Sequence, residues 1–339
     1  MNRRAASAVL LFGLFSLPPI LAADSGGFSI FVSNERSGDV SVIDGATNNV
    51  IATVPVGKRP RGTHASPDGK RIYVVTTGSP RMAPGVETER APGDKTADGM
   101  VTIDAATGKV IERWHLGSDP EQFAVSKEGK FAFLANEDDA TASIIDLESG
   151  QTRGTIKVSA EPEGVGVNPA SGEVSVTCED KGEVFVFAPN EQRILAQIEV
   201  GGRPRSVAFL PDGSRAYIPC EGPGYIAVLE ENKVVSKIQL EEGALPMGSV
   251  ISPDGRQLFV STGRGNKVAV IETASNTVAA MIPVGARAWG IALSPDGSRL
   301  YTANGASNDV SVVDTKTRKE MTRIKVGDGP WGIAVSARP

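Results

Sequence analysis

The 339-residue sequence predicts an all-β protein, a seven-bladed β-propeller with four antiparallel strands in each blade. The first observation is a short phrase that recurs seven times: a strand, two or three loop residues, usually a proline, and a second strand. The second observation is the spacing, because five of the six intervals between copies are 42 residues and the first is 60. A period near 40 with strand-like sequence is typical of propeller blades, since one four-stranded sheet cannot bury both faces alone. The anchors of the phrase are Pro60, Pro120, Pro162, Pro204, Pro246, Ala288 and Pro330.

The N-terminus predicts a secretory signal peptide at residues 1–23. Arg3 and Arg4 precede an apolar run, 5–21, that is followed by two alanines. A positive, then apolar, then small-residue order is typical of a cleaved leader. An uncleaved anchor is the alternative, but two prolines interrupt a run that is already short for a span of ~20 residues. We therefore expect residues 24–339 to form one propeller, periplasmic or secreted, without a membrane span.

The charge balance bears on the class of partner. The chain has 35 Lys and Arg against 40 Asp and Glu, a formal net charge of −5, and the leader contains two of the arginines. An acidic protein without a stripe of Lys and Arg binds nucleic acid and anionic membranes poorly. No nucleic-acid partner is expected.

One copy shows how a blade is built. The Pro-Asp-Gly turn that follows its first strand, at 211–213, recurs in three other copies, and these residues favour tight turns. Alternating apolar residues and β-branched side chains predict strands on either side of each turn. The strands expected in this copy are 206–210, 215–219, 225–229 and 234–240.

The innermost strand of each blade alternates small and bulky residues. Gly164 and Gly166 in one copy, and Gly290 and Ala292 in another, are interleaved with Val, Ile or Leu. A face of small residues lets neighbouring blades approach closely near the axis, where the sheets crowd. His64 stands where other copies place Ala, Gly or Val. It is a channel candidate that could bind a cofactor or substrate, and the alternative is a histidine packed in the gap between two blades.

The two ends of the chain predict how the ring closes. The mature chain begins with a second-position strand, 28–33, and ends with a lone first-position strand, 331–336. The C-terminal strand should therefore join the three N-terminal strands in one blade, which leaves no open edge. We expect Ile333 to lie beside Ile30.

The two cysteines, Cys178 and Cys220, are 42 residues apart and so occupy the same position in consecutive blades. A strand one step out from the axis-lining strand sits at a radius of ~12 Å. Equivalent points there are ~10 Å apart, beyond the ~7 Å that a disulfide spans between Cα atoms. We expect two buried thiols.

The first copy carries an insertion of about 18 residues near 79–96, between the second and third strands. It contains mixed charges and the turn-forming residues Pro84, Gly85, Pro92 and Gly93. Such an extension is either a binding lid or a disordered ornament.

The position directly after each anchor is the candidate binding rim, on the face where the loops surround the channel mouth. Seven equivalent positions carry two Arg, two Glu, one Met and two Trp. Different chemistry at a fixed position suggests recognition, and neutral drift of loop tips is the alternative. If this rim faces solvent, charge reversal at both Arg61 and Arg205 should change the melting temperature by only a few degrees. The positions are Arg61, Glu121, Glu163, Arg205, Met247, Trp289 and Trp331.

Acidic residues in the loops between second and third strands are expected on the same face. They are Glu35, Glu137, Asp138, Asp139, Glu179, Asp180 and Glu221.

The sequence predicts no catalytic residue and no metal site. Its two histidines, His64 and His115, have no metal-ligand spacing, and there is no Cys-x-x-Cys, haem-attachment or Gly-x-Ser-x-Gly motif. Glu121 and Glu163, in consecutive blades, are the best hint of a carboxylate pair for a hydrolase or for Ca²⁺.

The repeat itself resembles a known family. Three second strands end in Asn and two third strands begin and end in Asp, which is similar to the Tyr-Val-Thr-Asn family of β-propeller repeats, and the match extends across the whole mature chain. Examples are Phe31-Val32-Ser33-Asn34, Tyr301-Thr302-Ala303-Asn304 and Asp309-Val310-Ser311-Val312-Val313-Asp314. Cys178, Cys220 and Thr262 depart from the pattern by replacing Asn. With its leader, seven copies and insertion, the chain most resembles exported propellers associated with alcohol catabolism that depends on pyrroloquinoline quinone (PQQ).

The resemblance implies a non-catalytic binding or accessory protein. Its partner would be a quinoprotein dehydrogenase, a c-type cytochrome or a transport component, with PQQ or haem present only by association and no cofactor of its own. Two alternatives stay open. One is a metal-assisted hydrolase or lactonase that uses carboxylates at the channel mouth, and the other is a haem or quinone carrier with His64, Trp289 and Trp331 facing the bore.

Overall fold

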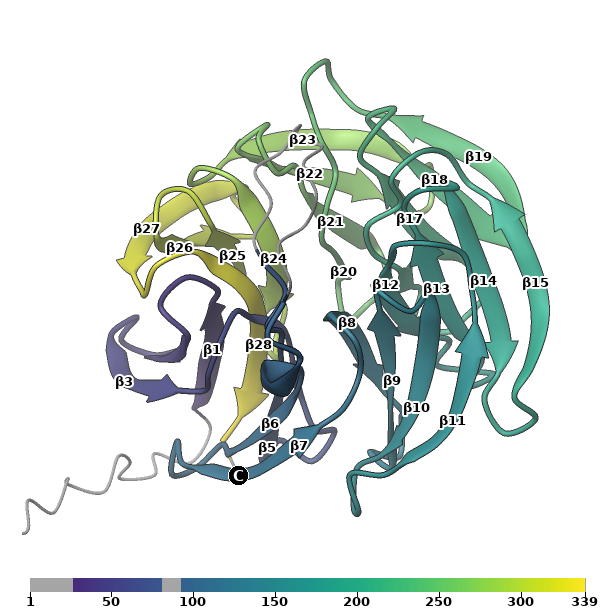
Figure 1. Ribbon diagram of the computed structural model, residues 1–339. Helices are drawn as coiled ribbons and strands as arrows, with labels where there is room; N and C mark the ends of the chain where they lie inside the picture. The colour runs from purple at the N-terminus through teal and green to yellow at the C-terminus, as the bar shows by residue number, and fades with distance from the viewer. Residues whose placement is uncertain (1–26, 81–92, 339) are drawn as a thin grey trace, which may run out of the picture.

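Seven four-stranded antiparallel sheets stand around a common axis in the computed structural model, which describes residues 27–80 and 93–338 (Figure 1). The first strand of each sheet lies nearest the axis and the fourth lies at the rim. The seven-bladed β-propeller predicted from the 42-residue period is confirmed.

The blades are numbered here from the one that contains both chain ends. Blade 1 consists of β28 (Pro330–Ala337), β1 (Phe28–Asn34), β2 (Asp39–Asp44) and β3 (Val50–Pro55). Blade 2 consists of β4 (Pro60–Ala65), β5 (Arg71–Thr76), β6 (Gly99–Asp104) and β7 (Val110–His115). Blade 3 consists of β8 (Pro120–Val125), β9 (Phe131–Asn136), β10 (Thr141–Asp146) and β11 (Thr152–Lys157).

The other four blades follow in chain order. Blade 4 consists of β12 (Pro162–Val167), β13 (Val174–Cys178), β14 (Glu183–Ala188) and β15 (Arg193–Glu199). Blade 5 consists of β16 (Ala208–Phe209), β17 (Ala216–Cys220), β18 (Tyr225–Glu230) and β19 (Lys233–Gln239). Blade 6 consists of β20 (Ser249–Ile251), β21 (Gln257–Ser261), β22 (Lys267–Glu272) and β23 (Thr277–Pro283). Blade 7 consists of β24 (Ala288–Leu293), β25 (Arg299–Asn304), β26 (Asp309–Asp314) and β27 (Lys319–Lys325).

Ring closure follows the prediction in topology and differs in register. The last strand, β28, pairs antiparallel with β1. Val32 lies opposite Ile333 and Ile30 lies opposite Val335, so the expected pairing of Ile30 with Ile333 is wrong by two residues. The register is set at the start of β28, where the anchor Pro330 faces Asn34 across a bulge. Ile30 and Ile333 still belong to one apolar cluster.

The apolar core is divided among the junctions between blades. Within the described ranges it forms seven clusters, and each cluster joins the side chains of two neighbouring blades. No blade has a core of its own, because each sheet buries its faces against the sheets on either side. The ring is therefore stable only as a closed set.

The glycines of the innermost strands let the blades approach at the axis, as predicted. A Cβ on Gly332 would lie 2.3 Å from the carbonyl oxygen of Arg61, and one on Gly290 would lie 2.5 Å from that of Trp331. Real Cβ atoms do not approach a carbonyl so closely. These positions therefore have no room for a side chain.

The two cysteines are buried free thiols, as expected from the spacing of equivalent points in the ring. Burial raises the pKa of Cys178 and of Cys220 to about 12. Both thiols therefore stay protonated and serve as small apolar side chains.

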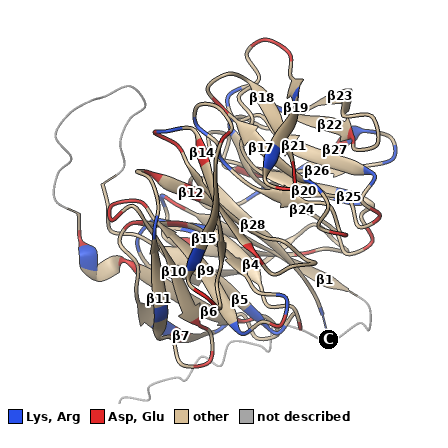
Figure 2. Ribbon diagram, turned by 90° about the vertical axis from the view of Figure 1, so that its right-hand side faces the viewer, with Lys and Arg blue, Asp and Glu red and all other residues tan. Residues whose placement is uncertain are grey.

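Two expectations concern residues that the structure does not describe. The leader at 1–23 lies outside the described residues, and so do residues 81–92 of the insertion. The described end of the insertion includes a short 3₁₀ helix, η1 (Lys95–Ala97), and Asp94 accepts a hydrogen bond from the N–H of Thr96 at its start. In 27–80 and 93–338, no helix has the length and apolar character needed to cross a membrane. Basic and acidic residues are interspersed over this part of the chain (Figure 2).

Closure can be tested at Ile333. Replacing Ile333 with Ala leaves a cavity in the cluster that joins blades 7 and 1, and we expect the free energy of unfolding to fall by about 2–5 kcal/mol. The matched control is Val278→Ala, which removes an apolar side chain that is 37% exposed and should change stability by roughly 0.5 kcal/mol or less. Urea denaturation followed by circular dichroism measures both. Equal effects would contradict a structural role for the β28–β1 junction.

Candidate functional site

A cavity of about 750 Å³ lies at the channel mouth, and all seven blades contribute to its wall. Its lining comes from the loops that lead into the first strands and from the loops between second and third strands. The seven positions expected from the sequence all line it: Arg61, Glu121, Glu163, Arg205, Met247, Trp289 and Trp331.

These seven residues are not loop tips. Each is the second residue of a first strand or stands at the equivalent place just before a shortened one, and all except the half-buried Trp289 are buried. Glu121 is only 1% exposed and Arg205 only 7%. The side chains therefore converge inward on one cavity. Charge reversal at Arg61 or Arg205 would place like charges together in a buried site, so we expect it to lower the melting temperature substantially.

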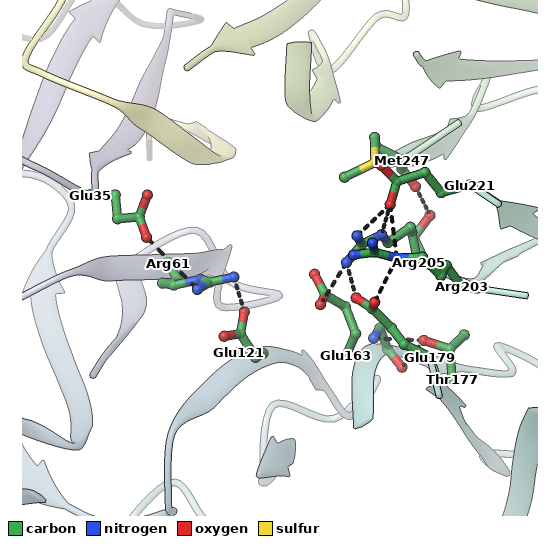
Figure 3. Close-up of polar contacts among 12 residues, drawn as sticks. Glu35, Arg61, Glu121, Glu163, Thr177, Glu179, Arg203, Arg205, Glu221 and Met247 are labelled. Carbon is green, nitrogen blue, oxygen red and sulfur yellow. Dashed lines mark hydrogen bonds and ion pairs between the residues drawn. The ribbon is translucent and has the colours of Figure 1, made fainter. Parts of the chain in front are cut away.

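Arg205 is held by three carboxylates (Figure 3). Its Nη1 lies 3.0 Å from Glu163 and also donates to Glu179, while its Nε donates to Glu221 at 2.7 Å. Arg203 contacts two of the same groups, at 3.0 Å from Glu179 and 3.4 Å from Glu221. Hydrogen-bonded ion pairs of this kind fix a buried guanidinium in one orientation.

Arg61 forms a second ionic group across the cavity (Figure 3). It pairs with Glu121 and lies 3.8 Å from Glu35, which also accepts from Arg59 at 2.9 Å. Burial raises the pKa of Glu121 well above its ordinary value, and neighbouring carboxylates add to this, although the charge of Arg61 opposes it. The cost of ionising Glu121 in this buried position thus favours its protonated form.

The two tryptophans form an aromatic stack beside the arginines. The ring centroids of Trp289 and Trp331 are 5.4 Å apart and the planes meet at 29°. The guanidinium of Arg61 lies 4.6 Å from the Trp331 ring, and those of Arg205 and Arg287 lie 5.6 Å and 5.3 Å from the Trp289 ring. Cations at these distances are attracted by the ring faces. The aromatic and ionic parts of the site are therefore in direct contact.

Sequence reasoning missed the residues that come immediately before the anchors. Five of them are charged, line the cavity and have a left-handed φ between 38° and 58°. This conformation turns the carbonyl toward the loop between second and third strands: Glu137 N–H donates to Asp119 O at 3.1 Å, and Glu179 N–H to Glu161 O at 2.9 Å. The signal was their shared place in the 42-residue period. The five residues are Arg59, Asp119, Glu161, Arg203 and Arg287.

Most of the predicted loop acids also reach the cavity. Glu35, Glu137, Glu179, Asp180 and Glu221 line it, and Asp138 and Asp139 are not part of the lining.

One group of carboxylates has the spacing of a cation site. Asp119, Glu121 and Glu137 each place an oxygen within 4.8 Å of the other two. Three carboxylates fall short of the six to eight oxygens that Ca²⁺ takes, and Arg61 competes for Glu121. Glu163 is not a member of this triad and pairs with Arg205, although its charge helps to raise the pKa of Glu121.

His64 lies outside the lining of this cavity. Its ring packs edge-on against Phe123 of the next blade, with centroids 4.7 Å apart. Burial lowers the pKa of His64 to about 4, so the imidazole is neutral at physiological pH. The structure thus places it in the gap between blades 2 and 3.

Comparisons with known proteins bear on the fold. No family model matches the sequence, and no curated protein matches it. A functionally unknown protein from Desulfotomaculum acetoxidans is similar in structure, with a TM-score of 0.76 at 16% identity over 93% of this chain and 100% of that one. A candidate 6-phosphogluconolactonase from Bacteroides uniformis gives 0.71 at 20% identity over 91% and 99%. The dihydro-haem d1 dehydrogenase NirN, in complex with DHE, gives 0.62 at 15% identity over 90% and 74%. Likeness at these identities shows the propeller fold alone, and the Tyr-Val-Thr-Asn resemblance stays a prediction.

The ionic group around Arg205 makes a stability prediction. Arg205→Ala leaves three carboxylates without their shared partner, and we expect the free energy of unfolding to fall by about 3–5 kcal/mol. The matched control is Arg203→Ala, because the Arg203 side chain is 55% exposed and its pairs should contribute roughly 1 kcal/mol or less. Chemical denaturation at neutral pH distinguishes the two. A small effect at Arg205 would mean that the carboxylates rearrange or take up protons at little cost.

His64 predicts a pH dependence of stability. Its folded pKa of about 4 lies below the ordinary 6.5, so the unfolded chain binds this proton first as the pH falls. The stabilisation is complete above pH ~6.5 and is lost as the pH falls through about 4. Between these two pH values, the free energy of unfolding of His64→Ala should therefore fall less than that of the wild type. The difference is at most about 3 kcal/mol, and solvent screening of the half-buried ring makes it smaller. The control Phe123→Leu should lower stability without flattening the pH profile. Parallel profiles for wild type and His64→Ala would contradict the assignment.

Proposed function

We propose that this chain is a non-catalytic binding protein that takes a small molecule into the cavity at the channel mouth. One observation carries the proposal: seven equivalent positions with different chemistry converge on a single cavity. Its volume of about 750 Å³ is within the range of small-molecule pockets, ~300–1,000 Å³. A position that only supported the blades would be filled alike in every copy, as the glycines that follow these residues nearly are.

The cavity chemistry suits holding a ligand better than transforming one. Among the described residues that line it, the polar groups are carboxylates and guanidiniums, and Ser, Thr, Cys and His do not occur. Hydroxyl and thiol nucleophiles and an imidazole base, which those four side chains supply, are therefore absent from the described lining. Both buried arginines are already fixed by carboxylates, an arrangement that orients a bound molecule.

The setting is also a proposal. The leader-like N-terminus supports an exported location, periplasmic or secreted. The resemblance of the repeats supports an accessory role in PQQ-dependent alcohol oxidation, beside a quinoprotein dehydrogenase, a c-type cytochrome or a transport component.

A cavity-filling variant tests the binding role. Gly202 lines the cavity, and a Cβ there would meet nothing within 4 Å, so a side chain can be added without strain. We expect at least one molecule from a panel of PQQ, haem and flat aromatic compounds of each charge to raise the melting temperature of the wild type. At a hundred times its Kd, a ligand adds ~2.7 kcal/mol of stability. The increase should persist in Gly202→Ser and disappear in Gly202→Trp.

Two outcomes would count against this function. A ligand that stabilises Gly202→Trp as much as the wild type binds elsewhere. If no member of the panel stabilises the wild type, the cavity is not a site for the compounds that its size and lining favour.

A further inference from the structure

The cavity wall changes character around the ring. In blades 6, 7 and 1 the position after the anchor carries Met247, Trp289 and Trp331. In blades 6 and 7 the position that carries glutamate in blades 3 to 5, in the loop between second and third strands, holds glycine, Gly263 and Gly305. We name these five residues the aromatic sector.

Gly305 of the aromatic sector keeps the Cδ1 edge of the Trp289 ring uncovered. A Cβ on Gly305 would lie 3.6 Å from Trp289 Cδ1, so a longer side chain there would cover that ring. Trp289 is accordingly the one member of the seven site positions that is only half-buried. A flat apolar surface is thus exposed toward the cavity on this side.

Blades 3 to 5 present mainly carboxylates, three of which pair with Arg205 of blade 5. We name as the acidic sector Asp119, Glu121, Glu137, Glu163, Glu179 and Glu221, all of which line the cavity. Around the whole described lining there are nine carboxylates and seven arginines, and among the buried and half-buried groups there are seven carboxylates and four arginines. Glu121, a member of the acidic sector, is paired with Arg61.

An excess of negative charge in a concave, partly desolvated site concentrates cations and repels anions. The tryptophan rings already attract Arg61, Arg205 and Arg287, so the carboxylates carry the preference for a cationic ligand. A flat polyanion such as PQQ would fit the aromatic surface but meet the wrong sign of charge beside it. The two sectors together select for shape and for charge.

Building on the proposed binding function, we infer that the preferred ligand is an organic cation with a flat apolar part, such as an arylalkyl ammonium. Its ring lies along the exposed part of Trp289, because Trp331 is buried against Trp289 and Arg61, and its ammonium group faces the acidic sector. The charge of this group decides affinity, and the ring decides orientation.

Three isosteric probes test the inference on the whole mature protein: 1-naphthylmethylammonium, 1-naphthalenemethanol and 1-naphthoate. Isothermal titration calorimetry should show the ammonium binding at least about tenfold more tightly than the alcohol, and the carboxylate binding most weakly. Raising the salt concentration from 50 to 500 mM should narrow the difference, because screening weakens the charge contribution.

Matched variants locate the effect. Glu137→Gln removes one half-buried carboxylate from the acidic sector and should weaken ammonium binding about fivefold while sparing the alcohol. The control Glu230→Gln removes the same charge from a residue that pairs with Arg215 outside the cavity lining, and it should leave all three affinities unchanged. Gly202→Trp should abolish binding of every probe.

The outcomes separate the inference from the proposed function. If the alcohol or the carboxylate binds as tightly as the ammonium and Gly202→Trp abolishes it, the cavity binds ligands but the preference for cations is overturned. If none of the three probes binds, the inference is overturned. The proposed function falls as well only if the wider panel, including PQQ and haem, also fails to bind.

Discussion

The structure depends on how closely the innermost strands of neighbouring blades approach one another. In five blades a glycine follows the site residue, and its missing side chain gives room to the backbone of the next blade. In blade 5 the same place holds Ser206, whose hydroxyl donates to the carbonyl of Met247 at 2.7 Å. Because these contacts fix the backbone of each site residue, its Cα has a constant position in the ring. The side chain can then vary between blades without disturbing the fold.

Much of the fold was predictable, because the period of a repeated sequence can be measured directly from the residue numbers. The 42-residue spacing gave the number of blades and the equivalent positions. A lone first strand at the C-terminus, with three strands at the N-terminus, could close the ring in only one way. The exact register was not readable, since it depends on the bulge that lets Pro330 face Asn34. A bulge shifts the pairing by local backbone geometry, and no residue type in β28 signals it.

The position of the site was predictable, but the orientation, burial and ion pairing of its side chains were not. Period alone brought Arg61, Glu121 and Trp331 to one ring, but it could not show that they point inward and are buried. Which carboxylate pairs with which arginine depends on side-chain reach: Arg205 contacts Glu163 of the preceding blade and Glu221 of its own. His64 shows the same limit, since a strand position allows either the channel or the gap between blades. The residues before the anchors were missed because their left-handed conformation is unusual for charged side chains.

The aromatic stack has a consequence for folding during synthesis, because Trp289 belongs to β24 and Trp331 belongs to the last strand, β28. Trp331 belongs to β28, the strand that also docks on β1. A nascent chain whose blades 2 to 7 are complete still lacks Trp331, so the wall of the channel-mouth cavity is not yet complete. A ligand that contacts Trp331 binds only when β28 is docked on β1. It therefore stabilises the closed ring by mass action. Ligand binding at Trp331 and closure of the ring are therefore thermodynamically coupled.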